Sequence, residues 1–312
     1  MERGRDGGAA MSRAVVFNQY GGPEVLELVD LPEPEPGPGQ VRLRVRAAGV
    51  QPADSKQRSG AWHAFAPVTF PGRLGHEAAG VVDAVGPDVT AFAPGDEVLG
   101  PATGAYADHA LAEAALLARK PAQMPWSEAG ALSASGQTAS TVLEDLKLAP
   151  GETLLVHAAA GGVGLIAVQL AKAQGVRVIG TARESNHDFL RALGAIPVTY
   201  GPGLADRVRE AAPEGVDAAV DAVGGEALDV SVELVEDRER IGTIADQAGA
   251  RRLGVRSLGT RRSGDRLAQL VSAYEAGQLK VFIWKEFPLE HVVAAHRESD
   301  GRHLRGKVVL LP

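Results

Sequence analysis

The middle of the chain holds a buried strand, a glycine-rich turn and an apolar helix in immediate succession, and this succession restricts the fold more than any other feature. The strand is Thr153-Leu-Leu-Val-His157, the turn continues as Ala-Ala-Ala-Gly161-Gly-Val-Gly164, and helical spacing of apolar residues extends to residue 174. Short strands at 177–180, 196–199 and 218–222 alternate with helical segments at 187–193 and 204–212. This alternation predicts βαβ units on a parallel sheet.

The turn has the form of a phosphate-binding loop. Read as G-x-G-x-x-G, its frame is Ala159, Gly161 and Gly164. In dinucleotide-binding folds the first small residue makes the tight turn, the second lets the backbone approach a pyrophosphate, and the third lets helix and strand pack closely. The helix N-terminus directs free N–H groups at the phosphates. We therefore expect the turn to bind a dinucleotide through Ala160, Gly161, Gly162, Val163 and Gly164. A turn that binds nothing is the alternative.

A basic residue occupies the position that distinguishes NAD from NADP in dinucleotide-binding proteins. NAD-binding proteins place an acidic residue about 20 residues past the motif, on the ribose 2′-hydroxyl. Counting 19 from Gly164 reaches Arg183 instead, after the next strand. A guanidinium pairs with a 2′-phosphate, so Arg183 favours NADPH. Tyr200, at the end of the following strand, would add a hydroxyl to the same phosphate. The alternative for Arg183 is a solvated charge on a loop, and the alternative for Tyr200 is an aromatic residue that merely ends a strand.

The flanking segments differ in character. Residues 12–122 contain short strands at 12–17, 41–45, 79–85 and 97–99, separated by Gly and Pro, which predicts a small antiparallel barrel. A helix is expected at 127–147, broken near Ser135-Gly136. Beyond residue 263 we expect a helix at 265–275, a strand at 280–284, a helix at 289–296 and a strand at 307–311. This tail either extends the parallel sheet or returns to the first domain.

Composition excludes several classes of protein. The 312 residues include no cysteine, which excludes disulfides, thiolate nucleophiles and zinc sites with Cys ligands. The net charge of −7 argues against a partner such as nucleic acid or an anionic membrane. No apolar run is long enough to cross a membrane, and the charged N-terminus is unlike a secretory signal, so we expect a cytoplasmic protein. Residues 1–10 are expected to be a flexible extension, and Met11 is an alternative start.

Taken together, these residues resemble the medium-chain dehydrogenase/reductase superfamily, and more narrowly its zinc-independent quinone oxidoreductase branch. The resemblance runs from Met11 to Pro312. The motifs that carry it are Tyr20-Gly-Gly-Pro-Glu-Val-Leu26, Ala47-Ala-Gly-Val50, Gly75-His-Glu-Ala-Ala-Gly80, the turn ending at Gly164, Asp221-Ala-Val-Gly224 and Gly306-Lys-Val-Val-Leu310.

The resemblance implies an α/β fold, with a doubly wound Rossmann sheet and a GroES-like β-barrel domain. The barrel domain would comprise residues 11–124 and 263–312, and the dinucleotide-binding domain residues 125–262. The family binds its cofactor between the two domains. Val223 is expected to contact the cofactor.

Zinc is not expected. Related alcohol dehydrogenases hold catalytic zinc with Cys and His, but the matching positions here fall near Gln51 and Ser135, which are poor zinc ligands. His76-Glu77 is therefore interpreted as a structural remnant that bonds within its loop. Without a Lewis acid nothing would stabilise an alkoxide, so the expected reaction is hydride transfer to an electron-poor acceptor.

The resemblance also suggests residues for the chemistry. Gln51 replaces a usual Asn beside the nicotinamide. Lys56 would donate a proton or stabilise an enolate, with Asp54 orienting it, unless the two form a surface salt pair. Thr138 matches a threonine that touches the nicotinamide, unless its hydroxyl bonds back along its helix.

The acceptor side is expected in two places. Trp62, His63 and Phe65 would line the substrate mouth, unless they form a simple surface loop, and Gln137 would face the substrate. Tyr106 is interpreted as barrel packing. Residues 253–260 resemble an edge strand used for pairing, which predicts a homodimer. The turn before it, Glu236-Asp-Arg-Glu-Arg240, lacks the usual glycines and must be built differently.

Three functions are therefore weighed. The first is an NADPH-dependent reductase of quinones or α,β-unsaturated carbonyls. The second is an enoyl reductase that acts in trans on a biosynthetic intermediate. The third is a non-catalytic NADPH-binding protein, suggested by Gln51 and by the lack of an obvious acid.

Overall fold

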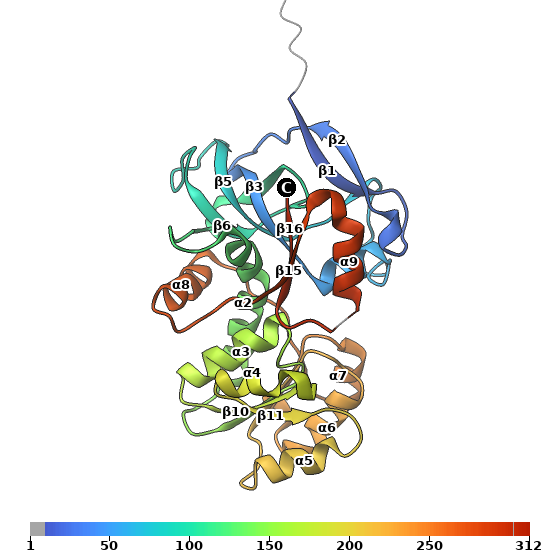
Figure 1. The fold of residues 1–312 in the computed structure, drawn as a ribbon, viewed down its shortest axis with the longest axis vertical. Helices are drawn as coiled ribbons and strands as arrows, with labels where there is room; N and C mark the ends of the chain where they lie inside the picture. Colours follow the sequence, from blue (N-terminus) through green and yellow to red (C-terminus); the bar gives the residue numbers. More distant parts are fainter. Residues whose placement is uncertain (1–9, 302) are drawn as a thin grey trace, which may run out of the picture. The chain divides into compact units, whose positions relative to one another are not determined.

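The computed structural model describes residues 10–301 and 303–312, so the predicted N-terminal extension lies outside it except for Ala10. The chain divides into two compact units (Figure 1). Unit 1 comprises residues up to Ser133, Lys285–His303 and Val308–Pro312. Unit 2 comprises Ala134–Trp284 and Leu304–Lys307. In the described ranges, no helix combines the length and the apolar character needed to cross a bilayer.

Unit 1 is built on antiparallel sheets. A three-stranded sheet has the order β2-β1-β4, and a seven-stranded sheet has the order β15-β16-β3-β5-β6-β8, with β7 also paired to β3. The elements are β1 Met11–Phe17, β2 Glu27–Pro32, β3 Gln40–Val50, α1 Pro52–Arg58, β4 Gly72–Arg73, β5 Glu77–Val85, β6 Glu97–Pro101, β7 His109–Glu113, β8 Ala118–Arg119, β15 Ile283–Pro288, α9 Val292–Asp300 and β16 Lys307–Leu311.

The alternation of β3 explains why it lies at the centre of unit 1. Val41, Leu43 and Val45 are buried, whereas the arginines between and after them are half-buried or exposed. Side chains two apart on a strand share one face, so the apolar face of β3 forms the core. The returning strand β16 pairs antiparallel with β3, Val309 opposite Gly49. The C-terminal strand thus returns to the first domain, which is one of the two predicted alternatives, and does not extend the parallel sheet.

Unit 2 is a six-stranded parallel sheet in the order β11-β10-β9-β12-β13-β14. Its elements are β9 Thr153–Val156, α3 Gly162–Ala173, β10 Arg177–Ala182, α4 His187–Ala192, β11 Ile196–Thr199, α5 Leu204–Ala211, β12 Ala218–Asp221, α6 Glu226–Leu234, β13 Ile241–Thr243, α7 Gln247–Leu253, β14 Arg256–Ser257 and α8 Gly264–Glu275.

Helices cover both faces of this sheet, because successive residues of its strands are buried on opposite sides. In β9, Leu154 and Val156 pack into one core with α3, whereas Leu155 packs into a second core with α5 and α6. Strands buried on both faces are typical of doubly wound parallel sheets. The βαβ units and the parallel sheet predicted from the alternating pattern are therefore present (Figure 1).

Two predicted elements differ in the structure. The helix α2, Trp126–Leu146, is continuous through Ser135-Gly136, which lie buried in its middle. Packing therefore overrides the low helix propensity of Ser and Gly. The strand expected at 280–284 is shifted to Ile283–Pro288, because the apolar run there fits several registers.

The sheet edge of unit 2 also differs in detail. Of the residues 253–260, only Arg256–Ser257 pair, as the edge strand β14. The elements β13, α6 and α7 were not predicted. The turn at 236–240 is built without glycine, since the Asp237 carboxylate accepts the N–H of Glu239 at 2.9 Å and Arg240 pairs with Glu152 at 2.6 Å.

The compact units have different bounds from the predicted domains at three places. Residues 125–133 fall in unit 1, and residues 263–284 and 304–307 fall in unit 2. The second difference has a clear cause, because α8 is tied to α2 within unit 2. Arg266 donates to Ser140 at 2.7 Å and to Glu144 at 2.6 Å.

Candidate functional site

The strand order of unit 2 reverses at one point, and a ligand crevice is expected there, at the carboxyl end of the sheet. From β9 the sheet grows outward through β10 and β11 on one side and through β12, β13 and β14 on the other. In open parallel sheets the loops diverge where the order reverses, and ligands bind outside the strands at that point. The reversal lies between β9 and β12, so the loops that follow these two strands, residues 157–161 and 222–225, flank the crevice.

The glycine-rich turn after β9 has the geometry of an open helix N-terminus. Gly161 is the N-cap of α3 and gives the helix no side-chain cap. The first N–H groups of a helix have no partner within it, so an anion would complete this end. A Cβ on Gly164 would lie 2.3 Å from the carbonyl oxygen of Ala158, which requires glycine there. The left-handed residue of the turn is Ala158, with φ of 55°, and not Ala159 of the predicted frame.

The segment Leu304–Lys307 of unit 2 packs against this turn. Gly306 donates its N–H to the carbonyl of Ala160 at 3.0 Å and forms a parallel bridge with Gly161. A Cβ on Gly162 would lie 2.8 Å from Cδ of Lys307, so this buried lysine stem packs against the start of α3. These contacts were not predicted, although Gly306-Lys307 stood in one of the recognised motifs.

Buried polar side chains hold the two loops. Thr181, on β10, accepts the N–H of Ala158 at 3.2 Å and so supports the left-handed residue of the turn. Asp221, fully buried at the end of β12, accepts the N–H groups of Val223 and Gly224, each at 2.9 Å. It also accepts the hydroxyl of Thr243 at 2.6 Å. The exposed Val223, a predicted cofactor contact, is therefore presented on a rigid loop.

His157, at the end of β9, belongs to the same buried layer. Its Nε2 lies 2.9 Å from Oγ of Ser231, and its Nδ1 lies 3.4 Å from Oγ1 of Thr181. Burial lowers the pKa of His157 from 6.5 to about 4, with Asp221 opposing the shift. The imidazole is therefore neutral at physiological pH and serves as a hydrogen-bonding support.

The predicted selector residues lie together. Arg183 follows β10 and Tyr200 follows β11, and these strands are neighbours in parallel register. The Nε of Arg183 donates to the hydroxyl of Tyr200 at 2.9 Å. Both side chains are exposed, so a guanidinium and a phenol hydroxyl lie next to each other on the rim of the sheet.

In unit 1, Gln51 is held at the start of α1 by a buried carboxylate. Asp54 is fully buried, and its Oδ2 accepts the N–H of Gln51 at 3.0 Å and the hydroxyl of Tyr106 at 2.8 Å. Its Oδ1 accepts the N–H of Gly75 at 3.0 Å. Burial, with the Asp54 charge adding to it, raises the pKa of Tyr106 well above 10, so the phenol stays a donor. Tyr106 therefore does more than fill the barrel.

The side-chain amide of Gln51 is left with an unused donor. The residue is only 9% exposed, and its Nε2 has no hydrogen-bond partner in the ranges that the structure describes. An unsatisfied buried donor costs about 1–3 kcal/mol, which a ligand oxygen would recover. Gln51 thus has the character of a binding group.

Lys56 lies on α1, and Trp62 and His63 belong to the aromatic loop that follows this helix. The Nζ of Lys56 lies 5.8 Å from the ring centroid of Trp62, and Nδ1 of His63 lies 3.1 Å from the hydroxyl of Tyr20. Asp54 does not orient Lys56, nor do they form a salt pair, because both oxygens of Asp54 are taken by Gln51, Gly75 and Tyr106. Sequence proximity suggested this pairing, but the turn of α1 directs Asp54 inward.

Thr138 and Gln137 belong to unit 2 and are used within it. The Thr138 hydroxyl bonds back to the carbonyl of Ala134 at 2.6 Å and lies 2.6 Å from Oγ1 of Thr260. Gln137 is fully buried, and its Oε1 accepts the N–H of Ser263 at 2.9 Å. The side chain of Gln137 therefore anchors the segment before α8 instead of facing an open pocket.

His76 bonds outside its own loop. Its Nε2 lies 2.9 Å from Oε1 of Gln57 and 3.6 Å from Oδ1 of Asp54, both on α1. The interpretation that His76 bonds within its loop is thus wrong, because α1 packs against it. Across residues 10–301 and 303–312, no group of three His, Asp or Glu side chains is placed to hold a metal ion.

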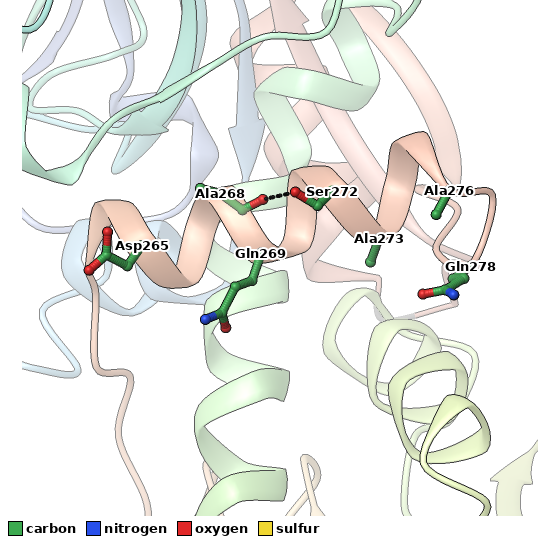
Figure 2. Close-up of a pocket in the computed structure, with 7 residues that line it drawn as sticks. All are labelled: Asp265, Ala268, Gln269, Ser272, Ala273, Ala276 and Gln278. Atoms are coloured by element: carbon green, nitrogen blue, oxygen red, sulfur yellow. Dashed lines mark hydrogen bonds between the residues drawn. The ribbon is translucent and has the colours of Figure 1, made fainter.

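A groove along α8 is separate from these residues. Figure 2 shows its lining, which comes from one side of α8 and from Gln278 beyond it. The wall contains alanines, Gln269 and Ser272, whose hydroxyl bonds back to Ala268 at 3.0 Å, and Asp265 is its one charged residue. It offers no pair of titratable groups for acid–base chemistry, so we do not assign it a catalytic role.

Comparison with known proteins gives the same picture of both units. Residues 37–125 match the family described as alcohol dehydrogenase GroES-like domain, and residues 193–310 match the family described as zinc-binding dehydrogenase. The chain is 37% identical to a quinone oxidoreductase of Pseudomonas aeruginosa, over 97% of this chain and 100% of the relative. The predicted GroES-like domain and Rossmann sheet are confirmed.

Two further matches bear on function. The solved structure of mycobacterial Rv1454c complexed with NADPH is 33% identical, with a TM-score of 0.87, and covers 96% of this chain and 100% of that chain. Erythronolide synthase EryA2 of Saccharopolyspora erythraea is 40% identical over 76% of this chain, which spans only 7% of the length of that synthase. The chain belongs to the quinone oxidoreductase branch of the medium-chain dehydrogenase/reductase superfamily, a family of oxidoreductases.

Proposed function

We propose that the chain is an NADPH-dependent oxidoreductase that delivers hydride to a quinone or to the β-carbon of an α,β-unsaturated carbonyl. The observation that carries the proposal is the buried, unpartnered amide nitrogen of Gln51 within the described residues. A donor of this kind fits an oxygen that gains negative charge during reduction, because preorganised donors stabilise such oxygens strongly.

The residues of unit 2 fit NADPH. The uncapped start of α3 at Gly161 offers backbone N–H groups to a pyrophosphate. Arg183 and Tyr200 offer a guanidinium and a hydroxyl to a 2′-phosphate. When bound, NADPH supplies the hydride. The protein then has to hold the cofactor, exclude water and provide a donor for the reduced acceptor.

The residues of unit 1 would serve the acceptor. Gln51 would donate from Nε2 to the carbonyl or quinone oxygen, and Asp54 would keep the start of α1 in place for it. Trp62 offers a half-buried ring against which a flat acceptor stacks. Lys56, beside Trp62, would give the proton, unless solvent does.

A second copy of the chain is the partner that we propose for the edge strand β14. Arg256–Ser257 pair on one side with β13, which leaves the other side of this edge for a second strand. Light scattering coupled to gel filtration tests this, and a monomeric mass at micromolar concentration would refute it.

The identity with part of a polyketide synthase supports a second candidate, an enoyl reductase that acts in trans on a biosynthetic intermediate. The test is NADPH consumption with a panel of benzoquinones, naphthoquinones, simple enones and enoyl thioesters. Turnover of quinones or simple enones supports the first proposal. Turnover of carrier-bound enoyl thioesters alone supports the second. Tight NADPH binding with no turnover would refute both and support a non-catalytic protein.

A further inference from the structure

One arginine organises the loop that carries Tyr200. Arg207, on α5, donates from Nε to the carbonyl of Thr199 at 2.9 Å, from Nη1 to that of Pro202 at 2.8 Å, and from Nη2 to that of Gly201 at 3.1 Å. The three acceptors lie on both sides of Tyr200 in the sequence. A single guanidinium therefore fixes the backbone before and after this residue.

The backbone of this loop needs such support. Gly201 and Gly203 have φ of 95° and 77°, so the chain turns sharply between β11 and α5. The Gly201 carbonyl also accepts the N–H of Leu204 at 3.0 Å, and Arg207 adds a side-chain donor to it and to the Thr199 and Pro202 carbonyls. A guanidinium carries five N–H groups in a rigid planar fork, which suits three carbonyls at once, whereas an ammonium group concentrates its donors at one point.

Tyr200 depends on this backbone for its position. Its side chain is 50% exposed, and within the described residues its one hydrogen bond is the 2.9 Å bond from Arg183. Half of the side chain is open to solvent, so the path of the loop contributes to where the hydroxyl lies. A shift of the loop would move the hydroxyl away from Arg183.

We propose that Arg207 is a positioning residue that sets the selectivity of this chain for nucleotides with a 2′-phosphate. The proposal rests on the proposed NADPH dependence. Arg207 acts through Tyr200 and Arg183, because its three nitrogens are already used on loop carbonyls. A role of this kind changes the ratio of affinities for nucleotides with and without the 2′-phosphate.

The chain offers a matched control on the same helix. Arg209 is exposed and pairs with Asp206 at 3.0 Å and with Glu233, and among the residues described it makes no hydrogen bond to the loop. Removing Arg209 therefore removes the same charge from α5 without freeing the carbonyls. Arg207→Lys keeps the charge but loses the fork.

The experiment is titration calorimetry on the full chain with adenosine 2′,5′-bisphosphate and adenosine 5′-monophosphate. We expect Arg207→Ala to lower the affinity ratio of the two probes about tenfold, Arg207→Lys to behave similarly, and Arg209→Ala to leave the ratio unchanged. The double variant Tyr200→Phe/Arg207→Ala should lose no more than Tyr200→Phe, since both act through one hydroxyl.

The outcomes separate the two proposals. No preference for the 2′-phosphate in the unchanged chain would refute the NADPH dependence itself. If the unchanged chain prefers the 2′-phosphate probe and Arg207→Ala keeps this preference, or Arg207→Lys keeps it in full, the role of Arg207 is refuted. The proposed NADPH dependence is not affected by that result. If Arg207→Ala does not fold, Arg207→Gln, which can still satisfy one carbonyl, replaces it in the comparison with Tyr200→Phe and the double variant. Losses of affinity ratio that add up in the double variant would overturn the proposal.

Discussion

Arg183 and Tyr200 meet across two adjacent parallel strands, with the Nε of the arginine 2.9 Å from the hydroxyl oxygen of the tyrosine. This bond fixes the position of the Nε edge of the guanidinium. The tyrosine thus orients the arginine, and a phosphate would meet a positioned group instead of a freely rotating one.

The first prediction concerns this pair. Arg183→Ala should weaken NADPH binding about tenfold to a hundredfold, since hydrogen bonds to charged groups are worth about 1.5–3 kcal/mol. NADH binding should change much less, because NADH lacks the 2′-phosphate. Tyr200→Phe should also weaken NADPH binding, but by less than Arg183→Ala. Fluorescence titration of both cofactors measures this, and equal losses for NADPH and NADH would contradict the assignment of Arg183.

The second prediction concerns Gln51. Gln51→Ala should lower kcat about a hundredfold, since the loss of one preorganised donor to a developing oxyanion has effects of this order. NADPH affinity should stay the same. Gln51→Asn keeps the amide with a shorter reach and should retain part of the rate. An unchanged kcat in Gln51→Ala would remove Gln51 from the chemistry.

The third prediction contrasts two glycines of the same turn. Gly164→Ala should destabilise the fold by about 1–3 kcal/mol, because its Cβ would lie 2.3 Å from the Ala158 oxygen. At Gly161 the closest atom is the same oxygen at 3.3 Å, so Gly161→Ala should fold normally but weaken NADPH. Urea denaturation and cofactor titration separate the two effects. Normal stability of Gly164→Ala would contradict the tight packing of turn and helix.

The fourth prediction concerns pH and a buried histidine of unit 1. Nδ1 of His296 accepts from Nη1 of Arg58 at 2.6 Å, and burial lowers the pKa of His296 from 6.5 to about 4. Between pH 4 and 6.5, His296 therefore binds a proton in the unfolded chain but not in the folded chain. The free energy of unfolding should fall as the pH drops from about 6.5 toward 4, by up to about 1.4 kcal/mol per pH unit from this group.

Denaturation curves at several pH values test this contribution. His296→Gln should reduce the slope of the free energy of unfolding against pH in that window, because the amide does not titrate. The exposed His291, substituted in the same way, serves as the control. An identical slope in His296→Gln and in the unchanged chain would show that His296 is not kept neutral by the fold.

Local patterns in the sequence predicted the frame of unit 2 well, since strand, turn and helix each depend on neighbouring residues. They did not predict β13, which is short and lacks a clear period, and the expected edge strand at 253–260 is reduced to the two residues of β14. They also broke α2 at Ser135-Gly136, where burial among neighbouring elements overrides local propensity. The register of an apolar run such as the one leading into β15 is equally undetermined without its partner strand.

For the candidate site, the sequence indicated which residues carry suitable groups but not what holds them. Asp54 was linked to Lys56 because they are close in sequence, yet it caps the helix that starts after Gln51. The spacing of three residues between Gln51 and Asp54 is the signal that would have revealed this. Arg207 gave no such signal, because its acceptors are main-chain carbonyls that any sequence presents.

The path of the chain has a consequence for synthesis. Unit 2 is not complete until residues 304–307 supply the partner of Gly161, and the large sheet of unit 1 gains β16 only from residues 307–311. Neither unit can therefore finish folding while the last residues of this sequence are still in the ribosome. A stop codon at position 304 would leave both units unfinished at once.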